Sequence, residues 1–519
     1  MPLSYIAGAI TGTPGVMVRL PSGRVAPAKE ALPAHALPLI ELAPKEGLGL
    51  INGTAPSAAA AALVVYEAQR MAVLAQLMTA FTAECLTGNV EWSAPFIHAI
   101  RPHPGQIEAA KNIRIFLTGS KLARGFDAGA GSKSRTDTAG LCQDRYSCRT
   151  APQWMGPYLE DLLLAQRQIE IELNSTSDNP VVEASPLAAS AGEGEVYSGG
   201  NFQAVSLTSA LDKARLATQM IGRMLFSQCT ELINPNLSNG LDPNLVHGDP
   251  DDSYTCKGID VNMAAYMAEL AALAHPPSAH VQSAEMHNQG INSLAFLTAR
   301  RTMEALDVLA HMTAAQIFVC CQAADLRDYH RRFLAAVPLA AAVDALNVSR
   351  EIKTLLKAQL PGVLQECWYE ANKIGHVDRC RIVASRLASH ILDVLAEKNV
   401  TSLTVDAVRR FQNAIQQRME SWVKDPANDP DRSFNNRSAA RVGLGQGAST
   451  LYNLARGELG VRFHLGLKDQ DRQTTIGSDV SKIYEAIRDE TVMDRVMSAF
   501  TREFDAVNGN ADGSLFAKL

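Results

Sequence analysis

Long apolar stretches with no strand-like alternation dominate the chain. Residues 55–87 are apolar on nearly every side and rich in Ala and Leu, with Thr54 before them and Gly88 after them, which predicts a long helix buried inside a bundle. Comparable stretches occur at 203–230, 258–274, 283–325, 377–397 and 478–504. The pattern predicts an all-α fold, a bundle of unusually long helices.

Polar, turn-forming segments separate these stretches. They read KEGLGLINGT (45–54), RPHPGQ (101–106), QDRYSCRTAPQW (143–154), NSTSDNP (174–180) and SGGNFQ (198–203). Loops so rich in Arg, Asn and Gln are either solvated connections or a binding surface. We therefore expect residues 1–340 to form the central bundle with the candidate motifs, 341–440 an inserted helical segment of plain chemistry, and 441–519 a C-terminal helical region.

Composition and charge exclude several classes of protein. With 47% hydrophobic and 20% charged residues, the 519-residue chain has an ordinary globular composition, and its net charge of −6 gives no basic footprint for nucleic acid. The nine cysteines include adjacent Cys320 and Cys321 but no CxxC, so neither a disulfide framework nor a zinc site is indicated. No apolar run reaches membrane-spanning length by this interpretation, and we expect a cytoplasmic protein.

The first candidate for chemistry is the segment from Gln143 to Arg149, which places an amide, a phenol and two guanidinium groups within seven residues. Arginine suits a carboxylate because it donates two parallel hydrogen bonds. Tyr146 can exchange a proton if cations nearby stabilise its phenolate. The alternative is a polar helix start with a surface arginine.

A second candidate lies inside the stretch 283–325. Glu285, Asn288, Gln289 and Asn292 recur at i, i+3, i+4 and i+7, which would stack them on one face of a helix. Polar groups on a core-like helix need partners. They would form either a site or a structural hydrogen-bond network.

Isolated amides and a lysine complete the candidates. Asn52 stands beside glycine, and Asn174 to Asn179 span a turn, where an anion-binding helix terminus competes with simple N-capping as the explanation. Lys257 just ahead of a helix is an anion contact or solvated surface. His98 and His103 lack a further ligand at suitable spacing, so we expect no metal. The absence of GxGxxG, Walker and GxSxG motifs argues against a nucleotide cofactor and acyl transfer.

In order and spacing, these motifs resemble the aromatic amino acid ammonia-lyases, and most of all the fungal phenylalanine or phenylalanine/tyrosine ammonia-lyases. The resemblance extends from MPLSYIAGAITG through RPHPGQ, QDRYSCRTAPQW and HVQSAEMHNQGINSL to LGVRFHLG and TIGS, and so covers essentially the whole chain. It implies the ammonia-lyase/fumarase-like bundle of long helices and a homotetramer with active sites built from three subunits.

The resemblance also implies a reaction, which removes ammonia from L-phenylalanine to give trans-cinnamate. Its difficulty is that the departing proton, beta to the carboxylate, is hardly acidic. The family meets this with an electrophilic methylidene-imidazolone ring, formed by cyclisation of an internal Ala-Ser-Gly and strengthened by helix dipoles. L-tyrosine is the other expected substrate.

Residue roles are carried over from the family's motifs. Arg149 would pair with the substrate carboxylate, Asn52 would support that carboxylate and the ring, and Tyr146 would be the phenol that assists proton movement. Glu285 would lie near the substrate amine as partner or base. The remaining site residues would surround ring and ligand by hydrogen bonds (Gln143, Asn179 and Asn288), at the far end of the aromatic pocket (Lys257), by packing (Phe202) and in support (Gln289).

One element of the family pattern is missing. In the family PLSYIAG follows closely after Ala-Ser-Gly-Asp-Leu, whereas no Ala-Ser-Gly occurs in these 519 residues. We therefore expect the chain alone to be inactive, either as an N-terminally truncated lyase or as a short product without catalysis. An aminomutase, a histidine ammonia-lyase and a non-catalytic partner subunit of a full-length lyase are the alternatives.

Overall fold

The computed structural model describes residues 2–124, 143–183, 194–400, 404–428, 442–466 and 474–508. They belong to two compact units. The first unit comprises Met1–Gln69, Asp161–Ala217 and Leu273–Leu306, and the second comprises Arg70–Glu160, Thr218–Ala272 and Asp307–Leu519.

Four long helices contribute residues to both units: α4 (Ala55–Cys85), α8 (Ala151–Leu173), α9 (Val205–Ile233) and α11 (Ala295–Ala336). Within the second unit, α4 and α11 are core helices, since Phe81 and Phe318 are fully buried. The predicted all-α fold is confirmed. The predicted limits agree to within a few residues for α4, α9, α10 (Lys257–Leu273) and α14 (His376–Glu397), whereas α11 spans Ala295–Ala336 and not 283–325.

The first unit also holds short elements around the polar loops. Its helices are α1 (Pro2–Ile10), α2 (Ala28–Ala34), α3 (Glu46–Ile51) and η3 (Pro277–His280). Its strands are β1 (Met17–Arg19), β2 (Val25–Pro27), β3 (Val181–Glu183) and β4 (Glu195–Tyr197). They form two antiparallel pairs, β1 with β2 and β3 with β4. At three residues each, the strands are too short for alternation to predict.

The second unit contains most of the remaining helices. They are η1 (Val90–Ser93), α5 (Pro95–Ala99), α6 (Pro104–Phe116), α7 (Tyr146–Arg149), η2 (Pro243–Leu245), α10 (Lys257–Leu273, with Leu273 in the first unit), α17 (Gln446–Asn453), η6 (Leu454–Glu458), α18 (Ile476–Arg488) and α19 (Thr491–Asn508). The single helix predicted at 478–504 is two helices, because Glu490 between them has a φ of 74°, which a right-handed helix cannot contain.

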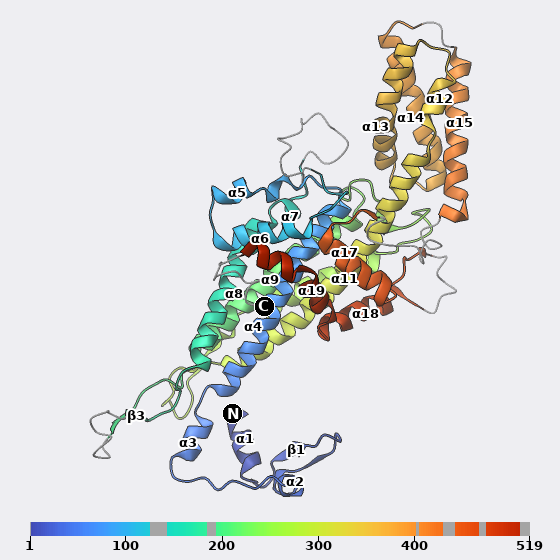
Figure 1. Cartoon of the computed structure of the whole chain (residues 1–519). Helices are drawn as coiled ribbons and strands as arrows, with labels where there is room; N and C mark the ends of the chain where they lie inside the picture. Colours follow the sequence, from blue (N-terminus) through green and yellow to red (C-terminus); the bar gives the residue numbers. More distant parts are fainter. Residues whose placement is uncertain are drawn as a thin grey trace. The chain divides into compact units, whose positions relative to one another are not determined.

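Within the second unit, α12 (Leu339–Asp344), α13 (Arg350–Glu370), α14 (His376–Glu397), α15 (Val405–Lys424) and η4 (Pro426–Asn428) follow α11 (Figure 1). They share an apolar core in which Leu356, Leu360 and Leu364 of α13 are buried at intervals of four, the spacing of one helix face. The helical character predicted for this segment is confirmed. The domain limits at 340 and 440 stay a prediction.

Two stretches of the described chain, Glu46–Cys85 and Ala295–Asp344, are long and apolar enough to cross a membrane by length and composition. This differs from the sequence prediction that no apolar run is long enough. The most apolar window of the second stretch is 83% buried within the protein, as in the core helix of a soluble fold. Length and composition alone are weak grounds for a membrane span.

Candidate functional site

The segment from Gln143 to Arg149 separates its residues into an outward and an inward set. Gln143 and Tyr146 are exposed, and Arg149 is partly exposed; Tyr146 keeps 70% of its surface accessible. Tyr146 and Arg149 are three residues apart on the short helix α7, which places them on one side of it, and Gln143 precedes that helix. The three outward residues are those to which the sequence assigned chemistry.

The inward residues anchor the segment to distant parts of the second unit. The buried Asp144 carboxylate accepts hydrogen bonds from the Asn89 backbone N–H and the Trp92 indole N–H, both at 2.6 Å. Burial raises the pKa of Asp144, and these hydrogen bonds oppose the shift. A Cβ at Gly88 would lie 2.6 Å from the same carboxylate, so only glycine fits there.

Two further anchors fix the turn itself. Arg145 Nε donates to the Leu237 carbonyl at 2.7 Å, and the Ser147 hydroxyl donates to the Glu231 carboxylate at 2.5 Å. Burial raises the pKa of Glu231, with Ser147 and Arg145 acting in the opposite direction. The outward side chains are thus held by a backbone that is fixed on its inner side.

Arg149 and Tyr146 lie together on the outer side. The Arg149 guanidinium is 5.6 Å from the centroid of the Tyr146 ring, and its Nη1 donates to the Gln143 side-chain oxygen. An exposed phenol beside a permanent positive charge is suited to binding an anion and to exchanging a proton. The structure brings Gln143, Tyr146 and Arg149 into one group.

In the first unit, the segments on both sides of α3 meet the loop after α8. Lys45 Nζ forms an ion pair with Asp178 at 2.7 Å, and the Thr54 backbone N–H points to Ser177 Oγ at 3.5 Å. Asn52 is exposed and stands at the C-terminal end of α3. Asn52 is the C-cap of α3 and is not adjacent to α4, which begins at Ala55, and Asn174 directly follows α8. The N-capping explanation is therefore wrong for both.

Asn179 connects this meeting point to the SGGNFQ loop. Its side-chain oxygen accepts a hydrogen bond from the Gly199 N–H at 2.9 Å, and Asn201 Nδ2 donates to the Thr176 carbonyl at 3.3 Å. Phe202 follows in the same loop, with 36% of its side chain exposed. Three polar segments distant in sequence, with Asn52, Asn179 and Phe202, thus meet in the first unit.

The motif around Glu285 is a turn, which corrects the prediction of a polar stripe on a helix. The Ala284 and Gln289 backbones pair with each other, and Asn288 Nδ2 donates to Glu285 Oε2 at 3.1 Å. All of residues 282–291 are exposed. The polar residues are therefore not buried partners within a core helix. Gly290 and the many Ser and Asn residues of this segment are the turn signal that the periodicity argument overlooked.

The backbone of this turn is strained. Glu285, Met286 and His287 have φ values of 51°, 52° and 68°, in the left-handed region that costs an L-residue about 1–2 kcal/mol. Met286 is 99% exposed, so packing of its side chain does not explain the conformation. Strain of this kind concentrates at functional sites.

Lys257 is the first residue of α10, and its Nζ lies 4.5 Å from the centroid of the Tyr254 ring. Among the described residues, no contact joins Lys257 to Arg149 or Tyr146. The candidate residues thus form three separate groups and one lone lysine, and their roles stay predictions.

One buried cluster was not found from the sequence. The ligand atoms of Asp242, His330 and His376 lie within 4.8 Å of one another, a spacing compatible with a metal ion. However, Arg379 Nη1 is 2.6 Å from Asp242 Oδ1, and both histidine Nε2 atoms face Oδ2, at 3.1 and 3.4 Å. The cluster is accounted for as a buried ion pair with two hydrogen-bonded imidazoles.

The charges of this cluster agree with that assignment. Burial opposes the Asp242 charge, but attraction from its basic neighbours holds the pKa of Asp242 well below its usual range. Burial lowers the pKa of His330 to about 4, so this imidazole is neutral near pH 7. Since Arg379 already balances the only carboxylate, a divalent cation would add uncompensated charge. The spacing of Asp242, His330 and His376 along the chain resembles no metal-ligand motif, which is why the sequence did not reveal the cluster.

Comparison with known proteins now decides the family. The model of the aromatic amino acid lyase family matches residues 1–347. A phenylalanine ammonia-lyase of Aspergillus hancockii is 42% identical over 522 residues, covering 96% of this chain and 72% of that protein. The chain belongs to the aromatic amino acid lyase family. It is therefore related to carbon–nitrogen lyases, and the resemblance inferred from its motifs is confirmed.

Two further relatives define the range within the family. A phenylalanine aminomutase of Talaromyces islandicus is 42% identical over 529 residues, with 98% of this chain and 72% of that protein covered. The crystal structure of phenylalanine ammonia-lyase from Rhodosporidium toruloides superposes with a TM-score of 0.86 at 36% identity, covering 96% of this chain and 75% of that one. Lyase and mutase sequences thus lie at similar distances from this family member.

Proposed function

We propose that this chain is part of a phenylalanine ammonia-lyase, which converts L-phenylalanine to trans-cinnamate and ammonia. The observation that carries the proposal is the 42% identity to the Aspergillus hancockii enzyme along 96% of the chain. The outward group of Gln143, Tyr146 and Arg149 supports it, because it offers a cation for a carboxylate beside a phenol.

In this proposal the chain's own residues bind the substrate and move protons. Arg149 holds the substrate carboxylate with a charge-assisted pair, while Gln143, already bonded to Arg149, fixes the guanidinium. Tyr146 exchanges a proton with the substrate, because its phenol is accessible beside that cation. Glu285, exposed on its strained turn, receives the ammonium group, with Asn288 fixing the carboxylate.

The remaining predicted residues would complete the proposed active site, which in the proposed homotetramer combines residues of three subunits. Asn52 and Asn179 supply amides for the carboxylate and the ring, and Gln289 supports the turn that holds Glu285. Lys257 and Phe202 would lie at the aromatic end of the pocket. L-tyrosine is the second proposed substrate.

The family's electrophile has its source in a tripeptide of the polypeptide. A methylidene-imidazolone ring forms from Ala-Ser-Gly, and these 519 residues contain no such tripeptide. The residues present therefore do not supply the group. We propose that the ring comes from an Ala-Ser-Gly outside these residues and that the 519 residues alone do not turn over.

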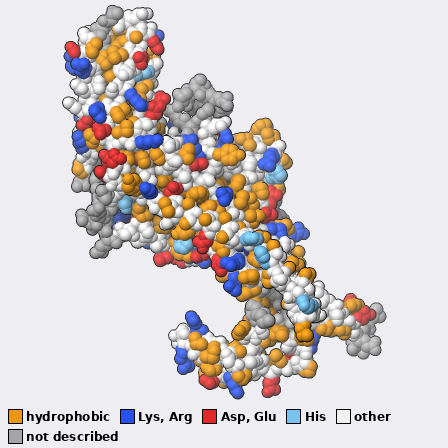
Figure 2. Space-filling model, turned by 180° about the vertical axis from the view of Figure 1, so that it is seen from behind, with side chains coloured by type: hydrophobic (Ala, Val, Ile, Leu, Met, Phe, Trp, Pro, Cys, Tyr) orange, Lys and Arg blue, Asp and Glu red, His pale blue; other side chains and the backbone are white. Residues whose placement is uncertain are grey.

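We also propose a homotetramer in the cytoplasm. On the first unit's part of α4, Leu63 is 73% exposed and Tyr66 43% exposed, and on α11 Met303 is 55% exposed. Apolar side chains are spread over the face of the molecule seen in Figure 2. Long helices with exposed apolar residues favour burial against further copies of the chain.

The test compares two proteins. One is the 519-residue chain, and the other is the same chain joined to the segment that precedes its first aligned residue in the Aspergillus hancockii relative, called the extended chain below. Each is incubated with L-phenylalanine, and cinnamate is followed by its ultraviolet absorbance. We expect cinnamate only from the extended chain. If a folded extended chain forms neither cinnamate nor β-phenylalanine, the proposal is contradicted. If the 519 residues alone form cinnamate, the requirement for an outside segment is contradicted.

A second candidate is favoured by one specific relative, the aminomutase of Talaromyces islandicus. A mutase returns ammonia to the other carbon, so chromatography of the products distinguishes the two. Accumulating β-phenylalanine would assign the mutase. If neither product forms but the chain co-purifies with a full-length lyase, it is a partner subunit.

A further inference from the structure

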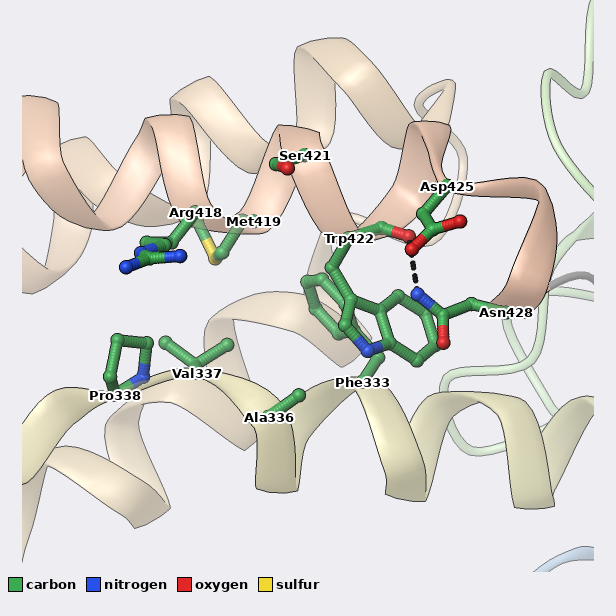
Figure 3. Close-up of a pocket in the computed structure, with 10 residues that line it drawn as sticks. All are labelled: Phe333, Ala336, Val337, Pro338, Arg418, Met419, Ser421, Trp422, Asp425 and Asn428. Carbon is green, nitrogen blue, oxygen red and sulfur yellow. Dashed lines mark hydrogen bonds between the residues drawn. The ribbon is translucent and has the colours of Figure 1, made fainter.

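A cavity of about 310 Å³ lies between the C-terminal end of α11 and helix α15. One wall comes from Phe333, Ala336 and the following Val337 and Pro338, and the other from α15 and η4 (Figure 3). All its lining residues belong to the second unit, and none is a predicted site residue of the lyase. Its size is at the lower end of the range for small-molecule sites.

An aromatic wall closes one part of this cavity. The Trp422 ring packs against Phe333 with 5.3 Å between centroids and against Tyr329 with 5.0 Å. Phe333 and Tyr329 are fully buried, which fixes the position of the partly exposed indole. Ala336, on the same α11 wall as Phe333, lines the cavity with a small side chain. A flat aromatic ligand fits such a space, because aromatic rings pack by offset stacking or edge to face.

A cation stands next to that wall. Arg418 precedes Trp422 by one helical turn, about 6 Å along the axis, so both side chains project from the same face of α15. In Figure 3 the Arg418 side chain extends from α15 toward the end of α11. Among the described residues, its guanidinium forms no ion pair or hydrogen bond. The Asp425 carboxylate at the other end of the cavity accepts the Ala427 N–H at 2.9 Å.

Arg418 also borders a second cavity of about 310 Å³, lined along α12 and α15 by small and apolar residues such as Ala341 and Ala414. The two cavities share Pro338, Arg418 and Ser421. Arg418 is exposed, and its guanidinium stands where the two cavities meet, so it supplies the cation that an anionic group would need there. An arginine in this setting favours a carboxylate, which accepts its two parallel donors.

We propose that this cavity binds a small aromatic carboxylate, with the ring against Trp422 and Phe333 and the carboxylate on Arg418. The ring-to-carboxylate spacing of a phenylpropanoid acid matches the one-turn offset between the two α15 residues. The inference stands on the cavity and does not depend on the proposed reaction.

The experiment is isothermal titration calorimetry of the 519-residue chain with trans-cinnamate. Arg418→Gln removes the cation, and Ala336→Phe fills the space beside the indole without changing charge. Arg410→Gln is the matched control, because Arg410 is exposed on the same helix outside both cavities. Circular dichroism checks that each variant is folded. We expect R418Q to weaken binding at least tenfold, A336F to abolish it and R410Q to leave it unchanged.

A neutral probe distinguishes the contribution of the carboxylate charge to binding from that of the aromatic ring. Cinnamamide should bind the unmodified chain more weakly than cinnamate does, and R418Q should bind the two equally. Binding that survives both R418Q and A336F overturns the proposal, as does the absence of any binding by the unmodified chain. Binding abolished by Arg149→Gln but not by R418Q would place the ligand at the lyase site and would overturn it as well.

Discussion

Glu84 is a carboxylic acid held inside the second unit, and its substitution tests the energetics of this core. The side chain on α4 is fully buried, and its Oε1 accepts the Gly445 N–H at 2.5 Å. Burial raises the pKa of Glu84 from 4.5 to about 8, with hydrogen bonds from Ser120 and Gly445 opposing the shift. The group is therefore protonated in the folded protein at neutral pH. Glu84→Gln keeps the shape of that protonated form and removes its titration.

The sign of the effect follows from proton linkage. Between pH 4.5 and about 8 the folded protein keeps the Glu84 proton, which the unfolded chain releases. The stability supplied by this group is thus fully present below pH 4.5 and is lost as the pH rises through 8. At about 1.4 kcal/mol per pH unit, the whole window is worth about 5 kcal/mol, of which about 4 kcal/mol falls between pH 5 and 8.5.

The assay is urea unfolding followed by circular dichroism at several pH values between 5 and 8.5. We expect E84Q to be similar in stability to the unmodified chain at pH 5 and progressively more stable above it, by about 4 kcal/mol at pH 8.5. Glu91→Gln is the control, because it makes the same change of charge at an exposed position. Its effect should stay within about 0.5 kcal/mol.

One result would refute this reasoning. If E84Q and the unmodified chain lose stability in parallel as the pH rises, Glu84 does not hold a proton in the fold. The hydrogen bond from Gly445 would then be made to an ionised carboxylate, and burial would not dominate the pKa of this group.

Three further changes test the candidate site and its anchor. Tyr146→Phe in the extended chain should lower kcat about 10²- to 10⁴-fold, because it removes the proton-exchanging hydroxyl. The melting temperature should stay unchanged, because Tyr146 is 70% exposed. A loss of kcat below threefold would exclude Tyr146 from catalysis. In steady-state kinetics, Arg149→Lys should lower kcat/KM by about 10- to 100-fold, because the bidentate pair with the substrate carboxylate is lost. Arg167→Lys, at an exposed position of α8, is the control and should leave kcat/KM unchanged. Equal effects of the two variants would show that Arg149 does not hold the substrate carboxylate. Gly88→Ala should destabilise the second unit by about 1–3 kcal/mol in urea unfolding, because its Cβ would lie 2.6 Å from Asp144; unchanged stability would show that the close approach is not obligatory.

The sequence determined most of the helical architecture. An uninterrupted apolar run such as 55–87 can bury its surface only as a core helix, so its conformation is encoded locally, and α4 spans Ala55–Cys85. The limits of α9 and α14 also follow closely the stretches predicted at 203–230 and 377–397. The residue types of the candidate motifs and their family resemblance were equally legible, since both depend on order along the chain.

The turn at Glu285 marks where local reasoning failed. Its polar residues fit a helical period, yet three consecutive positive φ values exclude a right-handed helix. Periodicity describes which faces would align if a helix formed, whereas glycine and asparagine decide whether one forms.

Only the tertiary structure decided which side chains face outward and which groups are charged. Tyr146 is exposed because Asp144 and Ser147 are held by Trp92 and Glu231, residues that no local pattern connects. The raised pKa of Glu84 arises from burial by elements far away in the chain. Burial and long-range hydrogen bonding depend on which segments meet in space, so they are set by the fold and not by the order of residues within any one motif.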